Sequence, residues 1–220
     1  MQNTRILEML NAGQIEELKA LIQDEIFTEG LKNSPGAKQR YSAMKKYFTY
    51  TKDDNNGNNA LHMPCVIDFE GEKYTSFVNG FSLALTKEDS GEMEQFDDPN
   101  NYLNVGKLMV YEGTEKEIDF TKVIAEAKSK GYKLNKSEVE RGNDWRYVFC
   151  YDGAFYKIGL LDATYGIINN GEKPTVYHKD GGKYSPLIIK NSIGYCLLLP
   201  VNTDEEELRT DKNKVVIDVA

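Results

Sequence analysis

The spacing of hydrophobic and polar positions changes once along this chain, from a helical period to a strand period. In the first 48 residues apolar side chains recur every three to four positions, as in Ile15, Leu18, Ile22 and Ile26. This spacing places them on one face of an α-helix. We therefore expect successive helices at 4–13, 14–27 and 37–48, with a break at 33–36 where Pro and Gly interrupt the pattern.

After a polar Asn/Gly run at 55–59, short apolar or alternating segments bounded by turn residues dominate the chain. They predict strands at 60–69, 73–79, 81–86, 105–111, 145–151, 154–158, 175–178, 187–190 and 194–201. Helical patterns occupy 120–130 and 160–168, and Asp152-Gly153 is typical of a tight hairpin turn. A last apolar run covers 215–219. The order of elements predicts an α+β fold of mostly antiparallel sheets with packed helices and a helical N-terminus.

An acidic segment suggests where the chain divides. Residues 88–98 contain six acids and no base: Glu88, Asp89, Glu92, Glu94, Asp97 and Asp98. Charge of one sign at this density is typical of a solvated loop. We therefore expect two parts, a helical N-terminus with a first α+β half at 1–113 and a second α+β half at 114–220, which repeats the order of elements.

Composition limits the class of protein. The 220 residues are 40% hydrophobic and 28% charged, which is typical of a folded protein with a conventional core. The longest nearly apolar run, 193–201, is far shorter than the roughly 20 residues of a membrane span. The first residues lack the pattern of a secretory signal, and the three cysteines lie singly in strand-like segments. We expect a cytoplasmic protein with buried, reduced thiols.

Motifs for common chemistry are absent from the sequence. It contains neither a glycine-rich phosphate loop nor a nucleophile elbow, and its two histidines, His62 and His178, are far apart. Acidic pairs such as Asp53-Asp54 lie in polar stretches, where charge serves solubility. We expect no catalytic residues, no metal and no cofactor, and a protein that is not an enzyme.

Charge is distributed unevenly. The stretch from residue 30 to 52 carries +6 and the rest of the chain −14, which together give the net charge of −8. Tyr41, Tyr47, Phe48 and Tyr50 alternate with these bases, and further lysines follow the helix predicted at 120–130. A basic segment with aromatics on an acidic protein fits a nucleic-acid backbone. The alternative is that the bases complement helix dipoles while the aromatics pack. The predicted DNA contacts are Lys38, Arg40, Lys45, Lys46, Lys128, Lys130 and Lys133.

Residues 152–201 resemble the closing part of the bacterial DNA polymerase III β sliding clamp. Ile158-Gly159 stands at the family's Ile-Gly, and Tyr165 lies near its helix tyrosine. Residues 186–189, Pro-Leu-Ile-Ile, match its "PL-x-I" strand, and residues 199–201, Leu-Pro-Val, match its terminal "MPV". The resemblance covers about 50 residues with short, apolar motifs, which a generic antiparallel α+β domain can also show.

The resemblance implies a DNA-clamp-like fold and a non-enzymatic processivity factor for DNA replication. Such a protein binds duplex DNA without reading bases, closes as a homo-oligomer and takes polymerase or clamp-loader peptides in an apolar pocket. The corresponding partner-binding residues here are Leu197, Leu199, Pro200 and Val201. The first half departs from the family, because its helices follow one another with no strands between 27 and 37.

Two other interpretations stay open. One is an α+β protein-interaction or regulatory module that does not bind nucleic acid. The other is an enzyme that uses carboxylates and tyrosines of the second half. Under the clamp hypothesis the protein is phage-like, its basic segment around 38–46 faces DNA, and its last predicted strand presents the peptide pocket.

Overall fold

The computed structural model describes residues 9–10, 13–33, 35–51, 62–109, 111, 113–139, 146–178 and 182–219. The chain forms two compact units, Met1–Lys38 and Gln39–Ala220. The first unit contains helix α2 (Ile15–Asn33), in which Leu18 is buried while Ile22 and Ile26 are exposed. The helix expected at 14–27 is therefore confirmed and extends further, whereas most of the one expected at 4–13 lies outside the described residues.

Helix α3 (Ala37–Thr51) begins at the end of the first unit and continues into the second. Its buried positions are Ala37, Arg40, Met44, Tyr47 and Thr51, which follow one another every three or four residues. This spacing puts them on one face, so the other face is left for solvent. The helix expected at 37–48 is confirmed.

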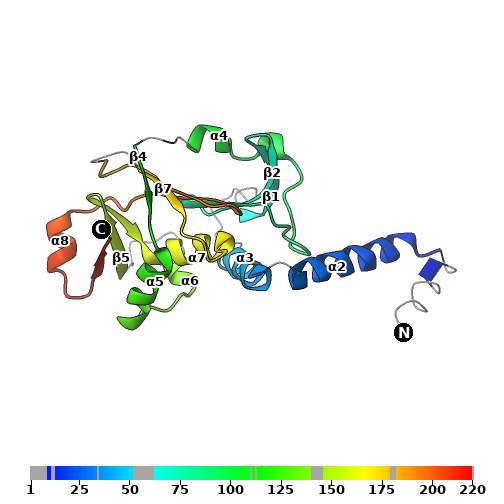
Figure 1. Ribbon diagram of the computed structural model, residues 1–220, viewed down its shortest axis with the longest axis horizontal. Coiled ribbons are helices and arrows are strands. Elements are labelled where there is room, and N and C mark those ends of the chain that lie inside the picture. The colour runs from blue at the N-terminus through cyan, green and yellow to red at the C-terminus, as the bar shows by residue number, and fades with distance from the viewer. Residues whose placement is uncertain are drawn as a thin grey trace. The chain divides into compact units, whose positions relative to one another are not determined.

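A seven-stranded antiparallel sheet forms the centre of the second unit (Figure 1). Its strand order is β1-β2-β3-β9-β8-β7-β4. The strands are β1 (Cys65–Phe69), β2 (Glu72–Val78), β3 (Ser82–Thr86), β4 (Thr114–Glu117), β7 (Thr175–His178), β8 (Leu187–Lys190) and β9 (Gly194–Leu198). Together with the helices this confirms the predicted α+β fold.

Within the second unit, the sheet joins two repeats that have the same order of elements. One consists of α3 followed by β1, β2 and β3, and the other of α7 (Ile158–Ile168) followed by β7, β8 and β9. They meet where β3 pairs with β9, with Ala84 opposite Cys196 at the middle of the ladder. The two strands approach closely, since a Cβ added to Gly194 would collide with the Leu85 carbonyl oxygen.

The turns before β3 and β9 repeat the same chemistry. The Asn79 side-chain oxygen accepts hydrogen bonds from the backbone amides of Phe81 and Ser82, at 3.0 and 2.8 Å. The Asn191 oxygen accepts from those of Ile193 and Gly194, at 3.0 and 3.1 Å. Each asparagine mimics a backbone turn and so starts its strand in register.

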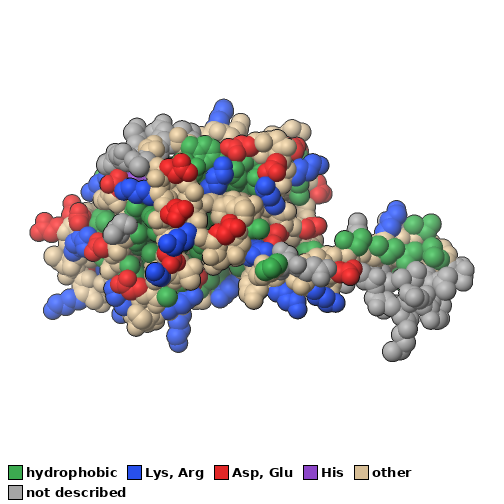
Figure 2. Space-filling model, in the orientation of Figure 1, with side chains coloured by type: hydrophobic (Ala, Val, Ile, Leu, Met, Phe, Trp, Pro, Cys, Tyr) green, Lys and Arg blue, Asp and Glu red, His purple; other side chains and the backbone are tan. Residues whose placement is uncertain are grey.

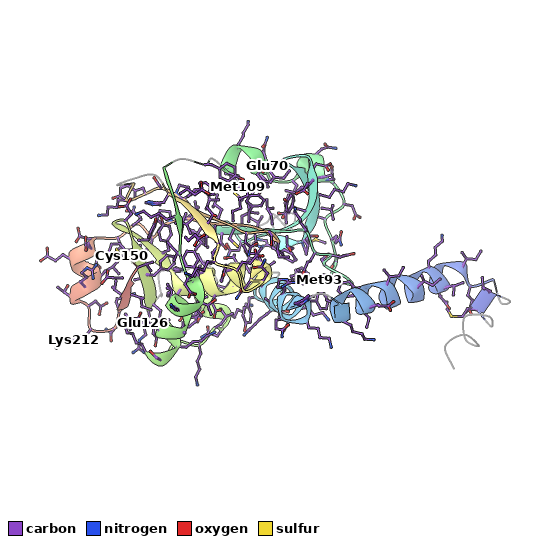
Figure 3. All side chains as sticks on the ribbon, viewed as in Figure 1. Glu70, Met93, Met109, Glu126, Cys150 and Lys212 are labelled. Atoms are coloured by element: carbon purple, nitrogen blue, oxygen red, sulfur yellow. The ribbon has the colours of Figure 1, made fainter. Side chains whose placement is uncertain are left out.

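Two cores cover the faces of this sheet. Helix α7 packs against β3 and β9 on one face, in the larger core, which also contains Met93 (Figure 3). The opposite face carries a second core with Met109, under the 3₁₀ turn η2 (Pro99–Asn101) and the short helix α4 (Val105–Leu108). Because both faces are covered, every residue of β3 and β9 is buried.

A second, three-stranded sheet has the order β10-β5-β6, made of β5 (Tyr147–Tyr151), β6 (Ala154–Lys157) and β10 (Val215–Asp218). Strands β5 and β6 form the predicted hairpin at Asp152-Gly153, while β10 runs parallel to β5. Helix α5 (Phe120–Ser129) packs against β10 and α7. The short helices α6 (Lys136–Val139) and α8 (Glu205–Thr210) complete the unit.

The structure differs from the predicted division of the chain. The boundary expected at 113/114 lies inside the second unit, because β1–β3 before it and β9, β8, β7 and β4 after it share one sheet. The acidic segment at 88–98 also makes contacts with the rest of the second unit, so it does not separate two domains. Arg40 donates to the Glu88 carboxylate, and the Phe96 amide donates to the Pro64 carbonyl at 2.8 Å.

The strand expected at 105–111 was also wrong, since residues 105–108 form helix α4. The Asn104 side chain accepts from the Lys107 amide at 3.3 Å and so caps a helical turn. The described residues include no helix with the length and apolarity needed to cross a membrane.

Candidate nucleic-acid interface and partner pocket

The exposed face of α3 presents two of the predicted basic residues. Lys45 and Lys46 are exposed, and each lies near a tyrosine one turn away on the helix. The Lys45 ammonium nitrogen is 4.6 Å from the centre of the Tyr41 ring, and that of Lys46 is 5.9 Å from the Tyr50 ring. These cation–π contacts hold both ammonium groups at the surface while leaving them hydrated.

Arg40 is a correction to the sequence-based site. Its side chain is 1% exposed, and its Nε donates to the Glu88 carboxylate at 2.9 Å. A second guanidinium nitrogen also bonds Glu88, and a third lies 3.4 Å from the Asn169 carbonyl oxygen at the end of α7. Arg40 therefore anchors α3 to the loop after β3 and to α7, and it is closed to a nucleic acid.

Lys38 and Lys130 are not among the residues that line the groove described below. Lys38 is exposed but is the last residue of the first unit. Lys130, at the end of α5, donates to the Glu126 carboxylate at 2.7 Å on its own helix. An exposed pair at this spacing stabilises the helix by only a few tenths of a kcal/mol.

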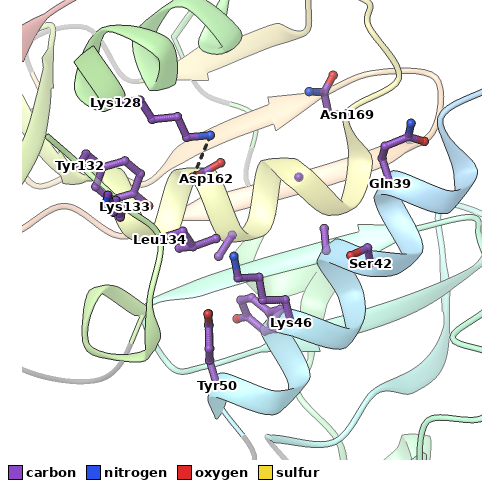
Figure 4. Close-up of a pocket in the computed structure, with 14 residues that line it drawn as sticks. Gln39, Ser42, Lys46, Tyr50, Lys128, Tyr132, Lys133, Leu134, Asp162 and Asn169 are labelled. Carbon is purple, nitrogen blue, oxygen red and sulfur yellow. Dashed lines mark ion pairs between the residues drawn. The ribbon is translucent and has the colours of Figure 1, made fainter. Parts of the chain in front are cut away.

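A groove of about 710 Å³ in the second unit brings three other predicted bases together (Figure 4). Lys46 comes from α3, Lys128 from the end of α5 and Lys133 from the segment that follows. Ala43 of α3 and Ala163 and Gly166 of α7 form its floor. The two helices are close there, because a Cβ added to Gly166 would lie 3.2 Å from the Ala43 Cβ.

Asp162 is the one acid among the described residues that line this groove. A carboxylate oxygen of Asp162 lies 3.5 Å from the Lys128 ammonium nitrogen, as the dashed line in Figure 4 marks. The Asp162 side chain is 15% exposed and that of Lys128 is 54% exposed, so this ion pair lies at the edge of solvent. The lining thus holds three ammonium groups against one carboxylate.

Tyr132 lies beside this pair. It is 2% exposed, and its hydroxyl makes no hydrogen bond of normal geometry to the described residues. Burial, and next the negative charge of Asp162, raise the Tyr132 pKa far above the usual range. The hydroxyl therefore stays protonated and is available as a donor.

The face of the second unit seen in Figure 2 carries acidic and basic side chains interspersed. Several of these charges pair locally, as in Lys87 with Glu72 and Arg209 with Asp218. The groove differs from such pairs because its bases outnumber its acid and come from separate segments.

The predicted partner-binding residues separate into two groups. Leu197 is 4% exposed and packs in the core under α4, so it was wrongly assigned to a binding surface. Leu199, Pro200 and Val201 follow the end of β9 and line a second cavity of about 490 Å³. Phe81, 41% exposed, joins them there.

Backbone contacts hold this second cavity in place. The Leu199 amide donates to the Phe81 carbonyl at 2.9 Å, and the Val201 amide donates to the Phe155 carbonyl at 2.8 Å. The segment therefore bridges the two sheets. Apolar side chains fixed in this way, together with the charged residues Lys157, Glu207, Asp211 and Lys214 of the lining, make a small pocket of mixed character.

The histidines and cysteines are not among the residues that line either cavity. His178 is 2% exposed, and its Nδ1 lies 3.4 Å from an Asp152 carboxylate oxygen. Burial raises the pKa of the Cys65 and Cys150 thiols, and Cys65 and Cys196 are fully buried. Within the residues that the structure describes, no group of three or more His, Cys, Asp or Glu side chains could hold a metal ion.

Several groove residues were missed from sequence. Asp162 is the only charged residue of α7, an otherwise apolar helix, and that isolation was the available signal. Nothing local indicated Tyr132 or Gln39. Neither models of protein families nor the curated proteins contain a match to this chain. The arguments for function therefore rest on the groove and the pocket.

Proposed function

We propose that this chain is a non-enzymatic, clamp-like DNA-processivity protein that binds the backbone of duplex DNA along α3 and the groove. The observation that carries the proposal is the convergence of Lys46 with Lys128 and Lys133, which are far apart in sequence, on one groove. Lys45 extends this basic surface along α3. We call Lys45, Lys46, Lys128 and Lys133 the basic surface.

The chemistry of the basic surface supports contact with phosphates. Lysine ammonium groups are flexible point charges that bind phosphate oxygens without the planar geometry that reads bases. Each phosphate they neutralise releases a condensed counterion, which drives binding of any sequence at low salt. The acidic remainder of the chain confines the nucleic acid to this surface.

The arrangement of the two repeats supports the clamp-like form of the proposal. Their helices α3 and α7 approach each other in the core on one face of a continuous sheet, and the exposed face of α3 is the helical surface available to a duplex. A protein that slides needs charge and shape and no reactive groups. From the resemblance of residues 152–201 to sliding clamps we also propose a cytoplasmic homo-oligomer that closes around DNA.

The second cavity supports a partner site. Leu199, Pro200, Val201 and Phe81 offer apolar surface that an extended peptide of a polymerase or clamp loader can bury. Because Leu197 lies in the core, the proposed peptide site consists of the three residues after β9 together with Phe81.

The proposal is tested with the variant Lys45→Glu, Lys46→Glu, Lys133→Glu. Binding of a fluorescent duplex is measured by anisotropy from about 20 to 200 mM salt, where phosphate contacts dominate affinity. We expect the affinity at low salt to fall at least about tenfold and the salt slope to decrease by about three, one for each lost contact.

The matched control reverses three exposed lysines outside the groove: Lys107→Glu, Lys122→Glu and Lys212→Glu. Both variants change the net charge equally, so they differ only in which part of the surface loses its lysines. Equal losses of DNA affinity in the two variants would show that net charge alone causes the effect, and would contradict the assignment of DNA binding to the basic surface.

The clamp-like form is tested separately with circular DNA. Retention on a closed circle that is lost after linearisation is expected for a ring, since a ring slides off a free end. Retention that does not depend on topology would restrict the proposal to a DNA-binding protein.

A protein-interaction module without nucleic-acid binding is the second candidate, and the cavity after β9 favours it. It predicts that duplex DNA fails to bind the chain in a salt-dependent way, while Leu199→Asp still removes a protein partner.

A further inference from the structure

Hydrogen-bond donors outnumber acceptors in the wall of the groove formed by Lys46, Lys128, Lys133 and Tyr132. The three ammonium groups are donors only, and the Tyr132 phenol is held protonated. Among the described lining side chains, the Asp162 carboxylate is the charged acceptor, and it is already paired with Lys128. Gln39, Ser42 and Asn169 add neutral side chains that can both donate and accept. The charged donors still outnumber the charged acceptor by three to one, and an anion with several oxygens would balance them.

The Tyr132 hydroxyl gives an independent indication that this arrangement is incomplete. It is buried and makes no hydrogen bond of normal geometry, although the Asp162 carboxylate is close enough to raise the Tyr132 pKa both by its charge and by a weak hydrogen-bonding interaction. Buried hydroxyls in native proteins are nearly always bonded. Asp162 can accept from Tyr132 in good geometry once it is no longer directed toward Lys128.

We propose that the groove is a discrete phosphate site that works by exchange: a phosphate group takes Lys128, together with Lys46 and Lys133, and Asp162 turns to accept the Tyr132 hydroxyl. No bond is made or broken and no proton leaves its group. Asp162 exchanges one donor for another, so the carboxylate stays neutralised or hydrogen-bonded in both states.

The dimensions of the groove fit a nucleotide. A volume of about 710 Å³ lies within the range of pockets for ligands of that size. Tyr50 and Leu134 add apolar walls for a sugar or base beside the three ammonium groups. The phosphate can come from a DNA strand or from a free nucleotide, and this inference rests on the proposed function only where the source is DNA.

The first experiment measures binding of a deoxynucleoside 5′-monophosphate and of inorganic phosphate by calorimetry, and their competition with a labelled duplex. In Asp162→Asn the amide no longer holds Lys128, so both anions are expected to bind about three- to fivefold more tightly. Glu126→Gln is the matched control, since Glu126 pairs with Lys130 on α5 outside the groove lining. Unchanged affinity in Asp162→Asn would overturn the exchange.

The second variant, Tyr132→Phe, removes the compensating donor. We expect anion binding to weaken about fivefold, the thermal midpoint of the free protein to stay within a degree or rise, and the weakening to shrink when Asp162→Asn is also present. Tyr184→Phe, at a tyrosine 64% exposed, is the control for loss of a hydroxyl. A lowered midpoint with unchanged anion binding would show that Tyr132 is only structural and would overturn the inference.

The outcomes separate this site from the proposed function. Binding of the nucleotide without binding of the duplex would refute the DNA proposal and leave the phosphate site standing. Binding of the duplex that neither anion competes with, and that Tyr132→Phe leaves unchanged, would refute the site and leave the DNA proposal standing. Absence of binding by all three probes would refute both.

Discussion

The two repeats of the second unit share one sheet and have equivalent asparagine turns. Their helices, however, differ in burial and in charge. Nine of the eleven residues of α7 are buried, and Asp162 is its single charge. Helix α3 instead exposes Lys45 and Lys46 and buries a charged residue, Arg40. Helix α7 is held mainly by apolar packing, whereas α3 combines buried Met44 and Tyr47 with the ion pair of Arg40 and Glu88.

This difference shows that one helix of a repeated fold can be structural while the other contributes to a binding surface. Helix α7 can serve as the floor of the groove because it contributes almost no charge of its own. The bases on its side come from Lys128 and Lys133, which belong to a different part of the chain. A basic surface therefore forms on a repeated fold although only one of the two helices is basic.

The largest effect is expected from the anchor of α3. Arg40→Ala leaves the Glu88 carboxylate, 20% exposed, without its main partner, and breaking such a pair costs about 3–5 kcal/mol. Urea unfolding measures the loss. Arg40→Ala should also weaken DNA binding at temperatures where α3 detaches.

Leu161→Ala in α7 is the comparison for Arg40→Ala, since Leu161 is fully buried and its loss costs about 2–5 kcal/mol through a cavity. High salt should reduce the effect of Arg40→Ala slightly, because a largely buried pair is screened only weakly, and should leave that of Leu161→Ala unaltered. Identical salt dependence would contradict the distinction between the two helices.

The next effect tests the junction of the two repeats. Gly194→Ala would place a methyl group against the Leu85 carbonyl, so the ladder between β3 and β9 must separate, at about 3 kcal/mol. Ser82→Ala, at the corresponding position of the first repeat, removes the side-chain hydrogen bonds to Asn79 and to the buried Tyr47 hydroxyl and should cost about 1–2 kcal/mol. Chemical denaturation of both variants checks the ratio, and equal losses would contradict the close approach at Gly194.

The smallest effect concerns the equivalent turns. Asn79→Ala and Asn191→Ala each remove an oxygen that accepts two backbone amides, and each should cost about 1–2 kcal/mol. Each side-chain amide also donates to a backbone carbonyl, Val139 for Asn79 and Ile168 for Asn191. Asn79 is the more buried, at 3% exposed, and its oxygen also accepts from the Ser82 hydroxyl, so its loss should be the larger of the two. Thermal unfolding measures both. A negligible effect at one position alone would break the equivalence of the repeats.

Much of the fold followed from the period of the apolar residues. Most of the predicted strands and the helices at 37–48 and 120–130 appear, because their patterns are local. Strand β4 was missed because Thr-Glu-Lys-Glu has no apolar alternation, and it forms only as an edge paired with β7. The boundary at 113 failed because pairing of β3 with β9 depends on residues far apart in sequence.

The sequence predicted those site residues whose charged side chains are exposed, and it failed for the buried ones. Lys46, Lys128 and Lys133 were identified as bases, but their convergence depends on packing of α5 against α7. Arg40 was misassigned because its sequence context does not show that Glu88 lies opposite. Leu197 and Leu199 look alike in sequence, yet only the second lies beyond the doubly covered part of β9.

The pairing of β3 with β9 also determines the order in which this protein can be completed during synthesis. Residues 82–86 form one edge of a partial sheet until residues 194–198 leave the ribosome. Closing so long a loop costs entropy before the ladder repays it, so this step is expected to be slow. Until then the apolar strand Ser-Leu-Ala-Leu-Thr has an open edge, a template for pairing with another nascent chain. The junction that unites the repeats is thus the point at which the unfinished chain most needs protection from aggregation.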